Sequence, residues 1–277
     1  MKKGMRTVAS GAVLIKATIE DNLRLIAELG YKEADILLIS GWAHIGLDEL
    51  ANDYANVSRR LGKALSTTGI EVSSFNTKYS VPLEDGSESA TRQRQLELEA
   101  LVRLMGDMSV ERATLQPTLT GDAEYLKQTF APTITEAYRH QQYAAERGFM
   151  ISLEPHVRSC ICTNAEIRKA WETYPELCIT ADPSHLLYSG EPMDSLGYLF
   201  EQATMVHLRD AGPGELFALH QKGRLDLRFT IDTLKRMGYD GPIALEYLSD
   251  EPDDGIYADL HKFRVAIDEC INQPAPE

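Results

Sequence analysis

The chain has 277 residues, of which 43% are hydrophobic and 25% are charged, as expected for a globular protein with a substantial buried core. Its 28 Lys and Arg against 42 Asp and Glu give a formal charge of −14, which opposes a nucleic-acid partner. No stretch of ~18 apolar residues exists to span a membrane, and no convincing leader peptide follows the basic start. We therefore expect a cytoplasmic protein with no membrane partner, disordered only in Met1–Met5 and Gln273–Glu277.

Strand-like and helix-like segments alternate along the whole chain. The predicted strands are Thr7–Ile15, Ala34–Ile39, Ile70–Phe75, Arg112–Gln116 and four later runs that begin at Ile151, Cys178, Met205 and Ile243. The predicted helices are Ile19–Leu29, Leu47–Thr67, Ser87–Met108, Asp122–Arg147, Asn164–Thr173, Ser195–Ala203, Phe229–Met237 and Tyr257–Ile271. Eight β/α units without a linker predict a single (β/α)₈ TIM barrel over residues 1–277, a fold that typically takes ~250 residues. A doubly wound sheet would need a glycine-rich G-x-G-x-x-G loop, which the sequence lacks.

The last four predicted strands each carry a metal-binding or proton-transferring side chain at the carboxyl end. These side chains are Glu154, Asp182, His207 and Glu246. In a barrel, the carboxyl ends of the strands form the mouth where active sites lie. Three carboxylates packed there repel one another unless a cation neutralises them. The oxygen-rich set suits a divalent metal, with Mn²⁺ expected first, Mg²⁺ or Co²⁺ next and Zn²⁺ less well matched.

Two of these four residues are glutamates, on the fifth and eighth strands, so they can approach a substrate from opposite sides. A metal that chelates a carbonyl and its neighbouring hydroxyl acidifies the C–H between them and stabilises the enediolate. One carboxylate then acts as the base and the second can return the proton. We expect an isomerase or epimerase of a small sugar or keto-polyol, with Glu154 and Glu246 as catalytic residues.

Five further residues are candidates for contacts with the substrate. They are His156, His185, Arg209, Trp42 and His44. The first three stand two or three residues beyond a predicted metal ligand, so their side chains can point into the same mouth. Trp42 lies in the loop after the second strand, where it could form an apolar wall for a sugar ring. A structural hydrogen-bonding role is the alternative for His185, as is a second metal position. Arg209 could neutralise an anionic group or orient a ligand carboxylate.

At these motifs the chain resembles the xylose isomerase-like TIM-barrel superfamily, in particular the sugar isomerase/epimerase group that includes D-tagatose 3-epimerase and myo-inosose dehydratase. The motifs are L-E-P-H at Glu154, D-P-S-H at Asp182, V-H-L-R-D at His207, G-R-L-D at Gly223 and G-Y-D-G-P-I-A-L-E from Gly238 to Glu246. The resemblance implies that the four candidate ligands bind a metal, that the two glutamates also move protons and that His185 touches the substrate.

The chain departs from the ketohexose 3-epimerases at two positions. Those enzymes place a further glutamate six residues after the first metal glutamate and an arginine six residues after the metal histidine. Cys160 and Pro213 stand at these positions. The second strand, which in relatives often ends in a glutamate, reads Ala34-Asp35-Ile36-Leu37. Recognition of the substrate is therefore expected to differ even where the metal site is kept.

Several alternatives stay open from sequence. A dehydratase or lyase acting on a keto-polyol or keto-glycoside would use the same metal site and lose a β-substituent after enolisation. An enzyme like AP endonuclease IV would need more ligands in the early strands than this chain offers, and its charge opposes DNA binding. A non-catalytic sugar-binding barrel gives no reason for two bases beside a metal. Assembly into a homo-oligomer is possible by analogy with such barrels.

Overall fold

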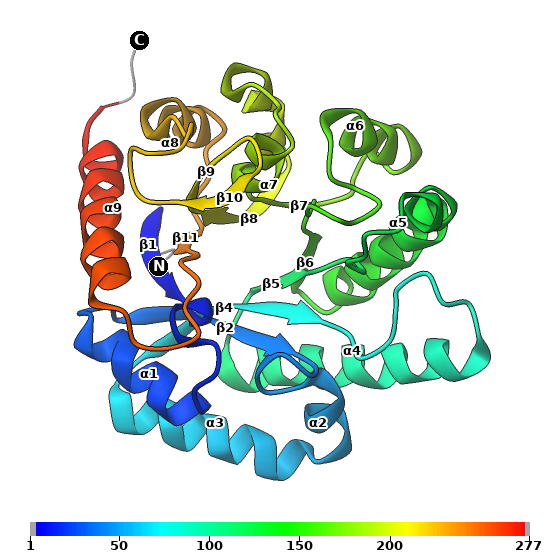
Figure 1. Ribbon diagram of the computed structural model, residues 1–277. Helices are drawn as coiled ribbons and strands as arrows, with labels where there is room; N and C mark the ends of the chain where they lie inside the picture. The colour runs from blue at the N-terminus through cyan, green and yellow to red at the C-terminus, as the bar shows by residue number, and fades with distance from the viewer. Residues whose placement is uncertain (1–3, 275–277) are drawn as a thin grey trace.

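The computed structural model describes residues 4–274, and eight parallel strands close into a barrel within a ring of helices (Figure 1). The barrel strands are β1 (Arg6–Ser10), β2 (Glu33–Ile39), β4 (Glu71–Lys78), β5 (Arg112–Leu115), β6 (Met150–Leu153), β7 (Ile179–Ala181), β8 (Ala203–Leu208) and β11 (Pro242–Leu245). They pair in the order β1-β11-β8-β7-β6-β5-β4-β2, and β1 also pairs with β2. The predicted TIM barrel is confirmed. Of the disorder predicted over Met1–Met5 and Gln273–Glu277, the parts at residues 1–3 and 275–277 lie outside the described residues. The prediction is wrong at Met5, which packs against the hydrophobic core, and at Gln273, whose amide donates to the Glu269 carbonyl.

The outer ring is built from helices that connect successive strands. They are α1 (Ile19–Glu28), α2 (Leu47–Asn52), α3 (Tyr54–Thr68), α4 (Glu88–Met108), α5 (Ala123–Ala145), α6 (Asn164–Thr173), α7 (Pro183–Tyr188), α8 (Leu227–Arg236) and α9 (Asp254–Asn272). Side chains that accept hydrogen bonds from first-turn amides mark several starts, and Thr163 forms a full capping box with Glu166. Among the described residues, no helix combines the length and apolar character that crossing a membrane requires.

The two faces of the barrel strands carry different side chains, because successive residues of a strand point to opposite faces. Outward residues such as Ile36, Leu38 and Phe75 join the large hydrophobic core that also contains helix residues. Inward residues are largely polar and bond across the barrel. Thr180 Oγ1, for example, lies 2.8 Å from Thr114 Oγ1 and 2.7 Å from Ser152 Oγ. The barrel interior is therefore polar toward its carboxyl end, while Val8, Met205 and Ala244 form a small apolar cluster deeper inside.

The first predicted strand and the second predicted helix are each wrong over part of their length. The strand predicted over Thr7–Ile15 ends at Ser10, because the Ser10 hydroxyl accepts a hydrogen bond from the Ala12 amide and starts the 3₁₀ helix η1 (Gly11–Leu14). The helix predicted over Leu47–Thr67 is divided between α2 and α3. Asp53, with φ −140° and ψ 57°, interrupts it.

Later in the chain, the structure adds short elements that the pattern of apolar residues does not predict. The helix predicted over Ser195–Ala203 is the 3₁₀ helix η2 (Met193–Phe200), and Ala203 already belongs to β8. A hairpin of β9 (Asp210–Gly212) and β10 (Glu215–Ala218) follows β8. A two-residue strand, β3 (Ala43–His44), folds back antiparallel on the end of β2.

Candidate metal centre

Four side chains, in or directly after the neighbouring strands β6, β7, β8 and β11, converge at the carboxyl end of the barrel. They are Glu154, Asp182, His207 and Glu246, and all four are buried. Each offers one ligand atom, and these atoms lie within 4.8 Å of one another. Metal–ligand bonds of ~2.0–2.2 Å would place ligands on opposite sides of an ion ~4.0–4.4 Å apart. The cluster has the size and the donors to hold one divalent metal.

Glu154 and His207 form the closest contact within the cluster. His207 Nδ1 lies 2.7 Å from Glu154 Oε1. The other carboxylate oxygen, Oε2, is buried and has no hydrogen-bond partner among the described residues. A buried carboxylate oxygen without a partner is costly, and a cation would satisfy it. This orphaned oxygen is an independent indication that the donor set fits a metal ion.

Arg209 supplies a positive charge inside the cluster. Its guanidinium donates to Glu246 Oε2 at 2.6 Å and to Asp182 Oδ2 at 3.1 Å, and the residue is only 2% exposed. The Asn76 amide approaches the other Glu246 oxygen at 3.3 Å. Burial raises the pKa of Glu246, and the adjacent guanidinium opposes that rise. Arg209, predicted to contact substrate or to orient a ligand carboxylate, bridges two of the predicted metal ligands.

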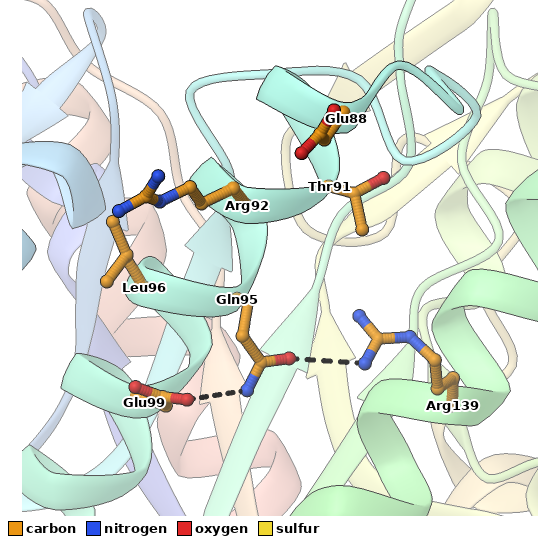
Figure 2. A pocket seen from close by; sticks show the side chains of 7 residues that line it. All are labelled: Glu88, Thr91, Arg92, Gln95, Leu96, Glu99 and Arg139. Atoms are coloured by element: carbon orange, nitrogen blue, oxygen red, sulfur yellow. Dashed lines mark hydrogen bonds between the residues drawn. The ribbon is translucent and has the colours of Figure 1, made fainter.

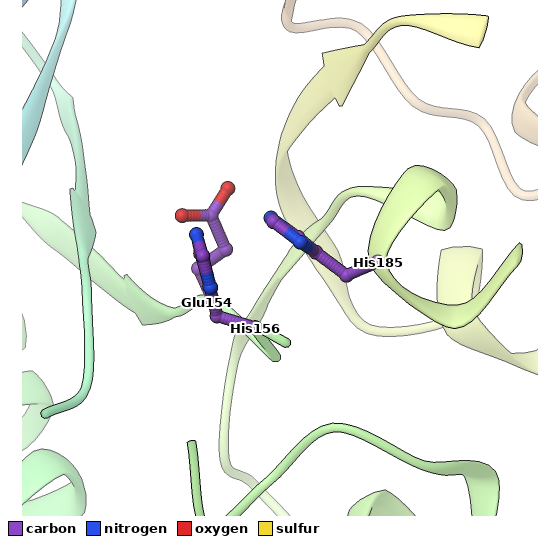
Figure 3. Close-up of side chains that lie close together, drawn as sticks. All are labelled: Glu154, His156 and His185. Carbon is purple, nitrogen blue, oxygen red and sulfur yellow. The ribbon is translucent and has the colours of Figure 1, made fainter. Parts of the chain in front are cut away.

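A second group of donors shares Glu154 and adds His156 and His185 (Figure 3). The two imidazole rings lie 3.7 Å apart between centroids. His156 Nδ1 donates to the Val157 carbonyl at 2.7 Å, so its Nε2 keeps the lone pair. His185 Nε2 accepts from Arg209 at 3.0 Å, since a guanidinium can only donate, and its Nδ1 therefore holds the proton. With the accepting nitrogen of His185 engaged, this group suits hydrogen bonds to substrate hydroxyls better than a second metal.

Sequence reasoning missed the role of Asp35, which approaches the cluster from β2. Its Oδ2 lies 3.7 Å from His207 Nε2, and Ser74 Oγ donates to its Oδ1 at 2.6 Å. Burial raises the pKa of Asp35 to about 6. Burial alone would lower the pKa of His207, but the carboxylates of Glu154, Glu246 and Asp35 together raise it to about 10. The sequence does contain a sign of this role: Asp35 is the one charged residue in the apolar run Ala34–Ile39. A carboxylate is almost never buried in such a strand without a partner.

A family profile described as xylose isomerase-like TIM barrel matches residues 23–266. The chain belongs to the xylose isomerase-like TIM barrel family. The resemblance predicted from the motifs at the strand ends is thereby confirmed. No curated protein gives a significant match to the chain.

Several solved structures superpose on most of the barrel. The 3-keto-D-glucoside 4-epimerase of E. coli has a TM-score of 0.69 and 17% identity, covering 94% of this chain and 99% of that one. The probable 3-DHS dehydratase of Bacillus anthracis involved in petrobactin synthesis has a TM-score of 0.68 and 14% identity, covering 94% and 98%. A xylose isomerase-like barrel from Mycobacterium smegmatis in complex with magnesium has a TM-score of 0.69 and 15% identity, covering 96% and 98%. At these identities the likeness concerns the fold.

In this xylose isomerase-like barrel, Trp42 and His44 belong to the β2–β3 hairpin and to neither donor group. His44 Nε2 lies 3.0 Å from the Leu14 carbonyl, so the ring ties the hairpin to η1. Burial lowers the pKa of His44, which keeps the ring neutral. Trp42 is 48% exposed in the turn. The structure thus gives His44 a structural contact and leaves the indole of Trp42 open to solvent.

The V-H-L-R-D and G-R-L-D motifs are joined through Asp210. Its carboxylate accepts hydrogen bonds from the amides of Ala211, Gly223 and Leu225 at 2.9–3.0 Å. A Cβ added at Gly223 would lie 2.1 Å from Asp210 Oδ1, so only glycine permits this approach. This network anchors the segment after β8 and so supports the backbone next to Arg209.

Two pockets differ in their relation to the cluster. One of about 420 Å³ lies on the outer surface between α4 and α5, where Gln95 bonds to both Glu99 and Arg139 (Figure 2). The other, of about 190 Å³, is lined by residues that follow β4 and β5, among them Gln116. Gln116 donates to Asn76 at 3.1 Å, and Asn76 contacts the metal-ligand candidate Glu246. Hydrogen bonds through Gln116 and Asn76 thus connect the lining of the second pocket to the candidate metal centre.

Proposed function

We propose that this protein is a divalent-metal-dependent isomerase or epimerase that acts on a small sugar or keto-polyol. The observation that carries the proposal is the order of ligands around the barrel mouth. Glu154 and Glu246 come from β6 and β11, and Asp182 and His207 come from the two strands between them. A substrate held at the centre would have a carboxylate on each side of its reacting carbon, as removal and return of a proton require.

The two glutamates would divide the proton transfers. Glu154 would accept the proton from carbon through whichever of its two carboxylate oxygens does not bind the metal, since a carboxylate can bind an ion through one oxygen alone. Glu246 is held by Arg209 and Asn76 and would face the opposite side of the substrate. A bound divalent metal would polarise the substrate carbonyl and stabilise negative charge on its oxygen.

Other side chains at the mouth would bind and orient the substrate. His156 Nε2 has a free lone pair that can accept from a hydroxyl, and His185 Nδ1 is a buried donor without a hydrogen-bond partner among the described residues. Arg209 would add a donor for an oxygen next to the reacting carbon. Trp42 would offer an apolar face to a sugar ring, while His44 would hold the hairpin that carries it.

We propose Mn²⁺ as the native metal, because three carboxylates and one imidazole form a hard donor set without a thiolate. The relative bound to magnesium supports a divalent ion in this fold. The relative named as an epimerase of a keto-glucoside supports a carbohydrate substrate. The net charge of −14 argues against a nucleic-acid substrate.

The test is proton NMR of the Mn²⁺-loaded protein in D₂O, after quenching and metal removal, with a panel of ketoses, inososes and 3-keto-glycosides. Deuterium entering the carbon next to a carbonyl, with formation of an epimer or isomer, supports the proposal. Glu154→Gln and Glu246→Gln should each abolish exchange. Glu97→Gln is the matched control, because this buried carboxylate binds the Ser80 amide at 2.9 Å and lies outside both donor groups. Exchange retained in both site variants would overturn the proposed mechanism.

The same assay separates the lyase alternative. Both reactions begin with proton removal, and the position of the second acid relative to a leaving group decides the outcome. A β-elimination would give an unsaturated ketone with a new conjugated-carbonyl absorbance in place of an epimer. The probable dehydratase among the structural relatives keeps this alternative open. No exchange across the panel, with metal bound, would place the substrate outside these classes.

A further inference from the structure

Asp35 and His207 come from opposite ends of the chain and meet in the barrel interior. Asp35 lies on β2, paired through its backbone with Ser10 of β1, and His207 lies near the end of β8. Both side chains are fully buried. Their closest atoms, Asp35 Oδ2 and His207 Nε2, are 3.7 Å apart, which is an ion-pair contact rather than a hydrogen bond.

The two nitrogens of His207 face different groups. Nδ1 faces Glu154 Oε1 at 2.7 Å and therefore lies on the side of the ligand cluster. A neutral imidazole that ligates a metal through Nδ1 must carry its proton on Nε2. That N–H then needs an acceptor, because a buried donor without a partner costs about 1–3 kcal/mol.

Two oxygen atoms lie near His207 Nε2, and a shift of less than about 1 Å would bring either to a normal hydrogen-bond distance from it. Thr114 Oγ1 lies 3.5 Å from His207 Nε2 but also takes part in a 2.8 Å hydrogen bond with Thr180. Asp35 Oδ2 is buried and has no hydrogen-bond partner within the described part of the chain. Ser74 holds the other Asp35 oxygen at 2.6 Å, which leaves Oδ2 directed to the histidine side. Asp35 Oδ2, which is charged and has no other partner among the described residues, is therefore the better acceptor for the His207 Nε2–H.

We propose that Asp35 is the positioning residue of the metal centre, accepting the His207 Nε2–H so that Nδ1 is presented to the metal. A carboxylate behind a metal-bound imidazole fixes the tautomer and the ring orientation and makes the ligating nitrogen more basic. Asp35 thereby acts on the metal through His207 and does not touch the substrate. This inference rests on the metal site proposed above.

Metal affinity provides the first test. The metal-free protein is titrated calorimetrically with Mn²⁺, and wild type is compared with Asp35→Asn and Asp35→Ala. Loss of such a partner typically weakens metal binding 10–100-fold. We expect Asp35→Ala to weaken binding most and Asp35→Asn less, because the amide oxygen still accepts but carries no charge. Asp259→Asn is the matched control, since this buried carboxylate binds Tyr247 and the His220 amide, and it should leave the affinity unchanged.

The state of the imidazole provides a second readout that a merely structural role would not move. Long-range ¹H–¹⁵N correlation spectra of the Zn²⁺-loaded, diamagnetic protein should show His207 protonated on Nε2 and bound to metal through Nδ1. This proton signal should shift in Asp35→Asn and be weakened or lost by exchange in Asp35→Ala. If Asp35→Ala does not fold, Ser74→Ala replaces it, because loss of the 2.6 Å hydrogen bond frees the carboxylate and should weaken metal binding to a smaller extent.

The outcomes separate this inference from the proposed function. If wild type binds no Mn²⁺, the proposed metal site fails and the role of Asp35 with it. If wild type binds Mn²⁺ and the folded Asp35 and Ser74 variants bind equally well with an unchanged His207 signal, the positioning role is overturned while the proposed function stands. Weakening by Thr114→Val and not by Asp35→Asn would also overturn it, because the threonine would then be the acceptor.

Discussion

Replacing Arg209 with methionine tests whether the guanidinium and a metal share the neutralisation of the same carboxylates. Methionine keeps much of the side-chain volume and removes the charge. Asp182 and Glu246, which receive hydrogen bonds of 3.1 and 2.6 Å from Arg209, would then face each other uncompensated. Breaking a buried ion pair by removing one partner costs about 3–5 kcal/mol.

This cost converts into a measurable shift in melting temperature. An unfolding entropy of about 2.1 cal/mol/K per residue, applied to the whole chain, makes a loss of 3–5 kcal/mol equal to a fall of roughly 5–9 °C. We expect Arg209→Met to show this fall in EDTA. In saturating Mn²⁺ the difference in melting temperature between Arg209→Met and wild type should become smaller. The ion supplies the missing positive charge, and its binding to the folded state adds stability.

Differential scanning calorimetry of both proteins, with EDTA and with Mn²⁺, makes the measurement. Arg94→Met is the matched control, because Arg94 is also 2% exposed and pairs with Glu136 at 3.0 Å outside the metal-ligand cluster. Its loss of stability should be the same with and without Mn²⁺. The reasoning would be refuted if Arg209→Met had the melting temperature of wild type in EDTA. It would also be refuted if Mn²⁺ reduced the loss in melting temperature no more for Arg209→Met than for Arg94→Met.

Two further predictions concern stability away from the candidate metal centre. Burial alone would raise the pKa of Glu136, but hydrogen bonds such as that from His140 hold it well below its usual range. Glu136→Gln should therefore lower the free energy of unfolding, measured in urea, most above about pH 5. The difference from wild type should shrink as the pH falls below about 4, and a difference that stays constant with pH would contradict this. Gly223→Ala should cost about 1–3 kcal/mol in calorimetry because its Cβ would strike Asp210. Gly121→Ala, where a Cβ meets nothing within 4 Å, should change stability little, and equal losses would dismiss the close approach.

Most of the fold could be predicted because local patterns decide it. The helix predicted over Asn164–Thr173 has those bounds in the structure, since Thr163 and Glu166 form its capping box from within four residues. The strand predicted over Thr7–Ile15 is too long because apolar residues continue past its end. Only the hydrogen bond of the Ser10 side chain to the Ala12 amide turns the chain there.

Part of the candidate site could also be predicted from local sequence, because some of its residues are marked by the strand that carries them. A ligand at the end of a buried strand is visible in the strand itself, so the convergence of Glu154, Asp182, His207 and Glu246 followed from the barrel. What each neighbouring side chain contacts depends on strands that are distant in sequence. For Arg209 the sequence left open whether it neutralises an anionic group or orients a ligand carboxylate, and only the structure shows its guanidinium bridging Asp182 and Glu246.

The pairing of β1 with β11, which closes the barrel, has a consequence for folding during translation. Arg6–Ala9 of β1 pairs with Pro242–Leu245 of β11, whereas only Ala9 and Ser10 pair with β2. During translation at about 5–20 residues per second, the first strand must wait roughly 10–50 s for its main partner. One edge of a nascent, nearly complete sheet stays open for that time, and open edges invite pairing with other chains. We therefore expect the nascent chain to be most prone to aggregation just before β11 leaves the ribosome.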